Sequence, residues 1–530
     1  MDDPARRPRG GGASRGGERR IVLRGVLLLL FCLTFWGPVV GRAEPLAAPD
    51  AYADVLQNLR GEVQTETSGE LSGYEIAATL DPAAETIGGT VRVHFVNRAA
   101  ATLREVYFRL FPNASYYGDG GLTVGSARVD GAAVKPGLEV EETALRVPLP
   151  APAAPGGAVA IELGFTTTVP LDSTGSYGIF NHDSADGTWI LADWHPILAV
   201  YEDGSGWRID PPTSFGDPTF SDSALYDVRL TAPAELTVVA SGVSAGEERR
   251  GEVVEHHFVA GPAREFTLVA DDDYTAASAE VNGTTIRVYT EPGETMAAAG
   301  KAALDVTVHA LGLFGQRFGA YPFAELDLVQ THLDGALAVS WSGLVFLDGP
   351  GLLEGYLTSD PAGFETVVAH EISHLWWGGG VGANSNDHTF LNEGLATVSA
   401  MLYQEETASG DVAASQLNAW VIGQARALLA SGDVVVDQPL RDDQDPVTQS
   451  EAFYAKAALG FFAIRQKIGD EAFYAGLLDY AEAYQFRIAG PDDLRASFER
   501  ASGQNLDEFW RHWFDSAALT AQEIDAGAGG

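Results

Sequence analysis

Residues 364–394 limit the possible fold and function of this chain more than any other segment. They contain the pattern His-Glu-x-x-His, formed by His370, Glu371 and His374, and they close with Glu393 and a glycine. Histidines four residues apart on a helix lie one turn apart on the same face, so both imidazoles can reach one metal ion. A hydrolytic zinc site takes three protein ligands and keeps a fourth position for water. The segment therefore predicts a zinc site with His370, His374 and Glu393 as ligands and Glu371 as the base.

The same segment has the apolar spacing of two helices joined by a loop. Three consecutive glycines, residues 378–380, separate the helices, and residues 385–387 offer side chains that can cap the second helix. The histidines and Glu393 lie outside the apolar stripes, so a helix–loop–helix can aim the glutamate at the histidines. A chance match in an ordinary helix is the alternative, but it leaves the loop and the downstream glutamate unexplained. The stripes are Phe364, Val368, Ile372 and Leu375, and then Leu391, Leu395, Val398 and Leu402.

The overall composition is that of a globular protein with a large acidic excess. Hydrophobic residues make up 46% of the 530 residues and charged residues 20%, and this length has room for two to four domains and a large core. The chain has 33 lysines and arginines against 73 acidic residues, a net charge of −40. Because little positive charge is available to neutralise phosphate groups, this balance argues against nucleic-acid binding. The single cysteine, Cys32, lies in an N-terminal apolar run, so the rest of the chain has no thiol for a disulfide or a metal.

The first 43 residues have the layout of a secretory signal peptide. Arginines are concentrated near the start, Val26–Trp36 is a short apolar run, and small residues stand at the end of the segment. We therefore expect residues 1–43 to be a signal peptide and the protein to be secreted, periplasmic or at the cell surface. The pair Arg19-Arg20 also resembles the start of a twin-arginine export signal. The alternative is that residues 21–40 stay as a membrane anchor, although the run is short for a full span.

The remaining chain changes from strand-like to helix-like patterns. Residues 44–70 are polar and weakly patterned, and we expect a linker there. Residues 71–274 contain short alternating runs separated by turn residues, which predicts an N-terminal antiparallel β-sandwich domain. Within it, residues 188–223 are rich in aromatic residues, proline and glycine and are expected to form the loops of a lid or a cleft. Residues 275–520 are mainly helical and residues 521–530 form a tail. The helices expected outside the metal site are 295–318, 415–430, 450–468, 471–484, 491–501 and 506–517.

Two motifs in the metal-site segment resemble those of a known family. HEISHLWWGG at residues 370–379 and FLNEGLA at residues 390–396 are similar to sequences of the gluzincin zinc aminopeptidases of the aminopeptidase N family. The resemblance covers about residues 70–520 and fits a short, two-domain bacterial-type member. It implies an α+β multidomain fold in which the β-domain precedes a thermolysin-like, mainly helical catalytic domain. It also implies one zinc ion per chain and a peptide or protein substrate. Further similar segments are Tyr74–Asn113, Asp193–Pro196, Gly216–Pro218 and Phe318–Phe323.

The resemblance also points to a tyrosine in the helical part. Tyr454, in the sequence Tyr-Ala-Lys-Ala-Ala, matches the family's Y-x-K-G/A setting. The resemblance implies that its phenol donates a hydrogen bond to the oxyanion of a tetrahedral intermediate, a role typically worth about 3 kcal/mol per donor. Without the family, Tyr454 would be interpreted as a packed core residue. Asn392 and Gly394, beside the third ligand, are interpreted as structural, and Trp376 and Trp377 as core or cleft wall.

One position departs from the family pattern. The family binds the free α-amine of its substrate with a glutamate in a G-x-M-E-N or GGMEYPG segment, and Ser340 stands at that position here. A hydroxyl group cannot supply the negative charge that pairs with an ammonium group. Ser340, Trp341 and Gly343 remain the candidate substrate-binding residues, and Asp193 or Glu202 could supply the missing charge.

Three functions stay open at this point. The resemblance implies a secreted zinc-dependent metallopeptidase, with an aminopeptidase as its main form. The serine at position 340 leaves open a zinc peptidase of altered specificity, which does not need a free amine. A catalytically silent binding protein on the same fold is the third, although the complete set of ligands, base and tyrosine counts against it. No nucleic-acid partner is expected, a membrane contact only if the N-terminal segment is retained, and the oligomeric state is left open.

Overall fold

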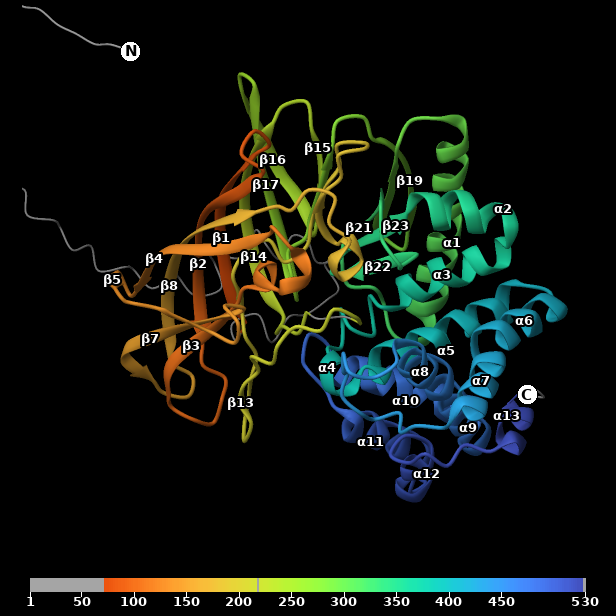
Figure 1. Cartoon of the computed structure of the whole chain (residues 1–530). Coiled ribbons are helices and arrows are strands. Elements are labelled where there is room, and N and C mark those ends of the chain that lie inside the picture. Colours follow the sequence, from red (N-terminus) through yellow and green to blue (C-terminus); the bar gives the residue numbers. More distant parts are fainter. Residues whose placement is uncertain (1–70, 217–218, 528–530) are drawn as a thin grey trace, which may run out of the picture. The chain divides into compact units, whose positions relative to one another are not determined.

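A computed structural model of the chain describes residues 71–216 and 219–527. The predicted signal peptide or anchor, Cys32 and the predicted linker lie outside these ranges, as do two residues of the Gly216–Pro218 motif, Asp217 and Pro218. Within the described residues, no helix is both long enough and apolar enough to cross a membrane. In chain order, the described part begins with strands and ends with helices (Figure 1).

The largest sheet has eight strands and forms one layer of the strand-rich part (Figure 1). Their spatial order is β16 (Val243–Arg250), β17 (Val253–Ala263), β14 (Ala224–Pro233), β1 (Ser72–Asp81), β2 (Thr86–Val96), β8 (Ala158–Thr168), β4 (Gly121–Val129) and β5 (Ala132–Ala133). In β1, the side chains of Tyr74, Ile76, Ala78 and Leu80 are buried, because alternate side chains of a strand point to one face. β1 pairs antiparallel with β2 but parallel with β14, so the predicted antiparallel sheet contains one parallel pair.

Two four-stranded sheets and a two-stranded ribbon complete the strand-rich part. Apolar side chains of these sheets, such as Phe108, Val147 and Trp189, share one core with the large sheet, as in a β-sandwich. The first sheet contains β15 (Thr237–Ala240), β18 (Leu268–Asp271), β10 (Trp189–Leu191) and β9 (Phe180–His182). The second contains β11 (Ile197–Leu198), β3 (Leu103–Arg109), β7 (Ala144–Ala153) and β6 (Gly137–Glu139), and the ribbon contains β12 (Tyr201–Glu202) and β13 (Gly206–Trp207). Short 3₁₀ helices lie at η4 (Phe111–Asn113), η5 (Ser115–Tyr117) and η6 (Gly175–Gly178).

A five-stranded sheet begins the second half of the chain. Its order is β19 (Thr275–Val281), β20 (Thr284–Thr290), β21 (Glu325–Thr331), β23 (Leu344–Asp348) and β22 (Ala338–Trp341). The three middle strands run parallel, and β22 pairs antiparallel with β23, so that Ser340 stands opposite Val345. Helix α1 (Glu294–Arg317) shares a core with this sheet through residues such as Leu304 and Phe314. Because β22 is an edge strand, one side of its backbone is free of sheet pairing.

The rest of the described chain is mainly helical, as predicted. Two of the predicted helices are interrupted by π-helical turns: residues 415–430 by η8 (Asn418–Ile422) and residues 450–468 by η9 (Glu451–Lys456). The predicted tail begins with a helix whose Ile524 is buried. The remaining elements are η7 (Gly349–Tyr356), α2 (Leu357–Ser359), α3 (Pro361–Ser373), α4 (Ser385–His388), α5 (Phe390–Thr407), α6 (Gly410–Leu417), α7 (Gly423–Ser431), α8 (Pro446–Ser450), α9 (Ala457–Ile468), α10 (Asp470–Ala483), α11 (Pro491–Ser502), α12 (Asp507–Trp513) and α13 (Ala521–Gly527).

Candidate active site

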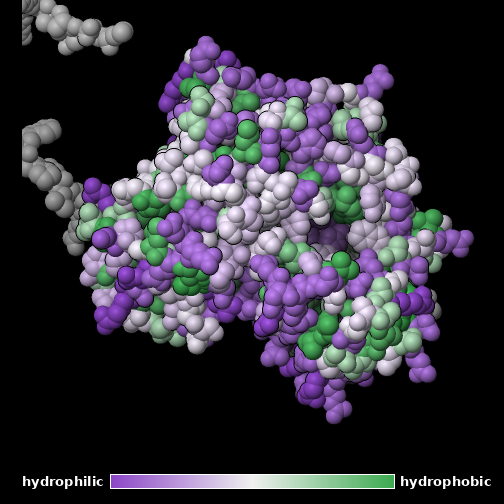
Figure 2. Space-filling view, in the orientation of Figure 1, coloured by the Kyte–Doolittle hydropathy of each residue, from purple (hydrophilic) through white to green (hydrophobic). Residues whose placement is uncertain are grey.

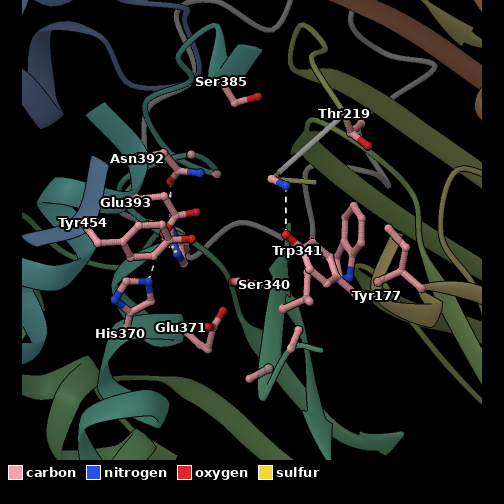
Figure 3. Close-up of a pocket in the computed structure, with 18 of the residues that line it drawn as sticks. Tyr177, Thr219, Ser340, Trp341, His370, Glu371, Ser385, Asn392, Glu393 and Tyr454 are labelled. Atoms are coloured by element: carbon pink, nitrogen blue, oxygen red, sulfur yellow. Dashed lines mark hydrogen bonds and ion pairs between the residues drawn. The ribbon is translucent and has the colours of Figure 1, made fainter. Parts of the chain in front are cut away.

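A cavity of about 460 Å³ lies where the strand-rich part meets the helices. Figure 2 shows the hollow on this face of the molecule. Helices α3 and α5 and the π-helix η9 supply one wall, and strand β22 supplies another (Figure 3). All five residues with predicted roles in metal binding or catalysis line this cavity: His370, Glu371, His374, Glu393 and Tyr454.

The histidines come from the end of α3. The helix begins after Asp360, whose carboxylate accepts a hydrogen bond from the backbone N–H of Gly363 at 3.0 Å. Pro361 takes the first helical position, where a backbone N–H has no partner in any case. The predicted apolar stripe of this helix is buried. His370 therefore projects from the last turn, and His374 follows the last helical residue.

Glu393 comes from the first turn of α5. The residues predicted to cap this helix, 385–387, form the short helix α4 instead, and α5 has no side-chain cap because the preceding Thr389 is itself helical. Gly394 lets α5 lie close to α9, since a Cβ at this glycine would meet the Cβ of Ala457 at 2.7 Å. A side chain at Gly394 would therefore move the third ligand away from the histidines.

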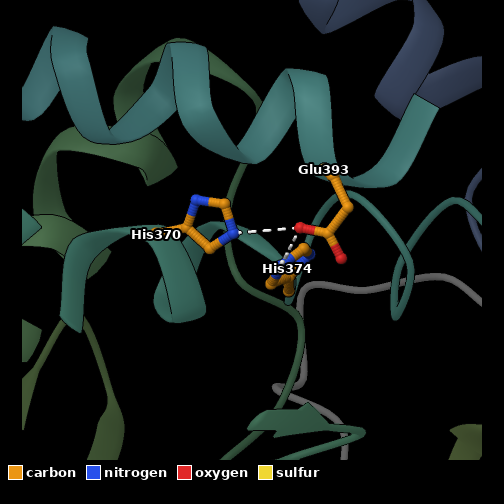
Figure 4. A group of neighbouring side chains, drawn as sticks. All are labelled: His370, His374 and Glu393. Carbon is orange, nitrogen blue, oxygen red and sulfur yellow. Dashed lines mark hydrogen bonds and ion pairs between the residues drawn. The ribbon is translucent and has the colours of Figure 1, made fainter. Parts of the chain in front are cut away.

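The three predicted ligands converge on one point (Figure 4). Nε2 of His370 lies 3.1 Å from Oε2 of Glu393, and Nε2 of His374 lies 3.4 Å from the same oxygen. None of the three side chains is more than 11% exposed. Two imidazole nitrogens and one carboxylate oxygen are a donor set that zinc takes in hydrolytic sites. The predicted ligands thus form a group that can hold one zinc ion.

Asn392 orients one of the ligands directly. Its Oδ1 lies 2.7 Å from Nδ1 of His374, which also lies 3.1 Å from the carbonyl oxygen of Trp377. With two acceptors beside it, Nδ1 carries the ring proton, and Nε2 presents its lone pair to the centre of the site. The backbone of Gly378, at φ +116°, leaves room for the amide, because a Cβ there would meet Oδ1 of Asn392 at 2.9 Å. Asn392 does more than shape the chain, which is all that the sequence suggested.

Burial and mutual attraction set the charges of these groups. Burial disfavours the charged ring of His374, but the adjacent Glu393 outweighs it and raises the pKa of His374 to about 10. Burial alone would also raise the pKa of Glu393, yet the two histidines hold that pKa well below its usual range. Glu393 is therefore a carboxylate at all ordinary pH values. The centre of the site favours positive charge, which protons or a metal cation can supply.

Glu371 and Tyr454 border this centre. Glu371 is 7% exposed, and burial raises the pKa of its carboxyl group against the opposing influence of both histidines. A raised carboxyl pKa suits proton transfer near neutral pH. The ring of Tyr454 stacks on that of His370 with centroids 5.9 Å apart and an interplanar angle of 10°. Burial and then the nearby Glu393 raise the pKa of Tyr454 well above its usual value, so its phenol stays a hydrogen-bond donor.

We expect Tyr454→Phe to lower kcat about 10²- to 10³-fold with little change in KM, because the phenol is placed to stabilise charge in the transition state. The substitution removes one oxygen and leaves the ring that stacks on His370. Initial rates with a fluorogenic peptide, measured alongside zinc content, check this. Tyr403→Phe is a matched control, since Tyr403 is buried in α5 and does not line the cavity. An unchanged kcat in Tyr454→Phe would contradict the role of the phenol.

Strand β22 carries the predicted substrate-binding residues. Ser340 and Trp341 line the cavity, and Figure 3 shows Ser340 near Glu371, with Trp341 farther from the metal-binding group. Gly343 does not line this cavity. It lies in the turn between β22 and β23 at φ +76°, a backbone conformation that favours glycine, so its part is to close the hairpin.

The aromatic-rich loops of residues 188–223 contribute to the cleft, one of the two forms predicted for them, through lining residues such as Phe215 and Phe220. The two acids suggested as replacements for the missing charge do not line the cavity. Asp193 accepts a hydrogen bond from the hydroxyl of Thr219 at 2.7 Å, and Glu202 forms an ion pair with Arg208. The loops therefore form part of the cleft, and neither of the two suggested acids lines it.

Comparison with known proteins finds similarity to one family of peptidases. Residues 302–513 match the Peptidase family M1 domain. The chain is 30% identical over 308 residues to aminopeptidase M1-A of Oryza sativa subsp. japonica. This match covers 56% of this chain and 34% of that protein. The chain is 25% identical over 242 residues to aminopeptidase N of Streptomyces lividans, covering 43% of this chain and 28% of that protein. The chain thus spans about a third of the length of the curated relatives it matches.

Solved structures of M1 peptidases share the fold. An M1 zinc metallopeptidase from Deinococcus radiodurans superposes with a TM-score of 0.62 at 20% identity, covering 85% of this chain and 94% of that chain. The same protein bound to a Tyr-Ser-Ala substrate gives a TM-score of 0.61 and covers 88% and 98% of the two chains. The predicted fold class, a β-rich domain followed by a mainly helical one, is confirmed, and so is the predicted relationship to the aminopeptidase N family.

Two charged residues of the cleft had no signal in the sequence. Arg264 and Glu265, in the connection between β17 and β18, line the cavity next to the end of β22. Nothing in their local pattern distinguishes them from surface residues, because their partners come from segments far along the chain. Trp376 and Trp377, in contrast, are buried core residues that do not line the cavity, in agreement with their structural interpretation.

Proposed function

We propose that this chain is a zinc-dependent metallopeptidase that hydrolyses peptide bonds. The observation that supports this most strongly is the convergence of three metal ligands, a buried carboxyl group and a phenol donor on one cavity. The match to the Peptidase family M1 domain supports the same reaction class. Each of these groups has a defined task in hydrolysis.

A zinc ion held by His370, His374 and Glu393 would supply Lewis acidity, polarising the scissile carbonyl group and lowering the pKa of water. Glu371 takes the proton of the attacking water and passes it to the leaving amine. Tyr454 donates a hydrogen bond to the carbonyl oxygen as negative charge develops on it. Asn392 keeps the ring of His374 in its working orientation throughout.

The finer proposal is an aminopeptidase, which removes residues from the N-terminus of a peptide. It is supported by the aminopeptidases among the matching relatives. Ser340 favours a second candidate, a zinc peptidase that accepts blocked or internal bonds, because the hydroxyl cannot neutralise a substrate ammonium group. The two candidates differ in whether acetylation of the substrate amine abolishes cleavage.

A mixed peptide library, analysed by mass spectrometry, tests both proposals. We expect zinc-dependent release of single N-terminal residues and complete loss of cleavage in the presence of a chelator, with recovery after zinc is restored. Pairs of free and N-acetylated peptides of the same sequence separate the candidates. A zinc-loaded chain that cleaves no member of the library would rule out the peptidase function.

We further propose that the protein is exported. The support is the arginine-rich start and apolar run within residues 1–43. The protein can be secreted, periplasmic or retained at the cell surface by residues 21–40. These three cases differ in the N-terminal residue of the protein and in the cell fraction that contains it. N-terminal sequencing of the protein recovered from medium, periplasm and membranes distinguishes them.

A further inference from the structure

Glu265 is an acid in the cleft that the proposed hydrolysis does not use. Among the described residues that line the cavity, the acids are Glu265, Glu371 and Glu393. The last two belong to the metal-binding and catalytic group, whereas Glu265 comes from the strand-rich part, between β17 and β18. Its side chain is buried, with an exposed fraction of 8% for the residue.

Two residues hold this carboxylate at the end of β22. Oε1 of Glu265 accepts a hydrogen bond from the backbone N–H of Ser342 at 2.6 Å. The Oγ of Ser342 in turn accepts a hydrogen bond from the backbone N–H of Arg264 at 3.0 Å. Ser342 lies in the turn that follows β22, two residues beyond Ser340 in the sequence. The carboxylate is therefore held at the turn after the strand that carries Ser340, and both residues line the same cavity.

The negative charge of Glu265 has no ion-pair partner among residues 71–216 and 219–527. The neighbouring Arg264 turns its guanidinium away to backbone carbonyl oxygens, at 2.5 Å from Gly378, 2.9 Å from Ser221 and 2.9 Å from Arg487. Burial raises the pKa of Glu265, while the hydrogen bonds from Ser342 and the charge of Arg264 oppose the rise. A buried carboxylate without a paired charge is costly, and a cation entering the cleft would remove that cost.

We propose that Glu265 binds an ammonium group of the peptide substrate and thereby supplies the anion that Ser340 cannot. This rests on the proposed peptidase function, because the ligand is a peptide in the same cleft. The ammonium group can belong to the N-terminus or to a lysine side chain. The chemistry of recognition, a charge-assisted hydrogen bond to a carboxylate, is the same for both.

Binding to an inactive chain separates this inference from the question of turnover. In the Glu371→Gln background, dissociation constants are measured by calorimetry for three peptides of one sequence. The first has a free N-terminus, the second is N-acetylated, and the third is N-acetylated with lysine as its first residue. The measurements are repeated after addition of Glu265→Gln, which keeps an acceptor for Ser342. Glu202→Gln is the matched control, because this acid lies in the same half of the chain and outside the cavity.

We expect Glu265→Gln to weaken binding of the free-amine peptide about 10- to 100-fold, because it removes one hydrogen bond to a charged group. Binding of the plain acetylated peptide should change less than about twofold. A loss confined to the acetylated lysyl peptide would assign the ammonium group to a side chain. Equal losses for all three peptides, or none, would overturn the proposal. Glu202→Gln should leave all three constants unchanged.

A second measurement tests the proposal even if the Glu265→Gln variant does not fold. The chain that carries Glu371→Gln alone should already bind an ammonium-bearing peptide more tightly than the plain acetylated one. If it shows no such preference, the proposal is wrong whatever Glu265→Gln does. Adding Ser340→Glu to Glu265→Gln should restore part of the preference, because a carboxylate then returns to the same strand end. If the intact chain does not hydrolyse peptides, the proposed function is wrong. The dissociation constants would still show whether Glu265 binds an ammonium group.

Discussion

Glu371→Gln should lower kcat for peptide hydrolysis by about 10²- to 10⁴-fold and leave zinc content and thermal unfolding close to those of the native chain. The amide has nearly the same shape as the carboxylate but cannot take a proton from water. Burial raises the pKa of Glu371, and the buried histidines and Glu393 shift it in opposite directions. We therefore expect the loss of its charge to affect the reaction more than the packing of the fold. Steady-state rates combined with metal analysis measure both effects.

Glu365→Gln is the matched control for this experiment. Glu365 lies on the same helix, α3, and does not line the cavity. Its amide variant should retain kcat within about twofold, as expected for a substitution away from the reacting atoms. Equal loss of activity in both variants would mean that helix α3, and not the proton acceptor, had been damaged.

Lys456→Met should reduce the free energy of unfolding by about 3–5 kcal/mol, the range found when one partner of a buried ion pair is removed. The ammonium group of Lys456 lies 2.7 Å from a carboxylate oxygen of Asp433 and 2.7 Å from the carbonyl oxygen of Val434, and it also bonds to the carbonyl oxygen of Ser516. The two side chains of the pair are only 1% and 9% exposed. Without the lysine, Asp433 keeps a buried charge that has lost its ion-pair partner. Chemical denaturation at constant zinc concentration measures the change.

Two further variants show whether the unpaired charge is the cause. The double variant Lys456→Met with Asp433→Asn removes the charge and keeps an acceptor for the backbone N–H of Leu519, so it should regain part of the lost stability. Lys301→Met breaks an exposed pair with Asp305 and should change stability far less. A Lys456→Met chain as stable as the native one would contradict the importance of this pair. Because Lys456 ends the π-helix that carries Tyr454, we also expect kcat to fall in the single variant.

The metal site was predictable from sequence because its chemistry fixes short spacings. His370 and His374 must be one helical turn apart, and a third ligand had to follow within the next helix. Tyr454 was different, since only family resemblance separated it from a core tyrosine. The structure places all of these side chains on one cavity. Local pattern and a known motif were sufficient to select the residues that the structure brings together here.

The groups that shape the cleft were not predictable in this way. Arg264 bonds to the carbonyl oxygen of a residue 223 positions away, and Glu265 contacts Ser342 across 77 positions. Strand β16 is almost entirely exposed, so it lacks the apolar alternation by which strands are recognised. The π-helical turns, including the one that presents Tyr454, have no distinct composition. These features depend on tertiary packing, which overrides local preference.

The three carbonyl contacts of Arg264 also connect segments that are far apart in the sequence. They join a loop of the strand-rich part, the loop after α3 and the chain before α11 through one buried guanidinium. Widening the cleft along this seam would break three charge-assisted hydrogen bonds at once. A substitution at Arg264 would therefore loosen all three segments at once.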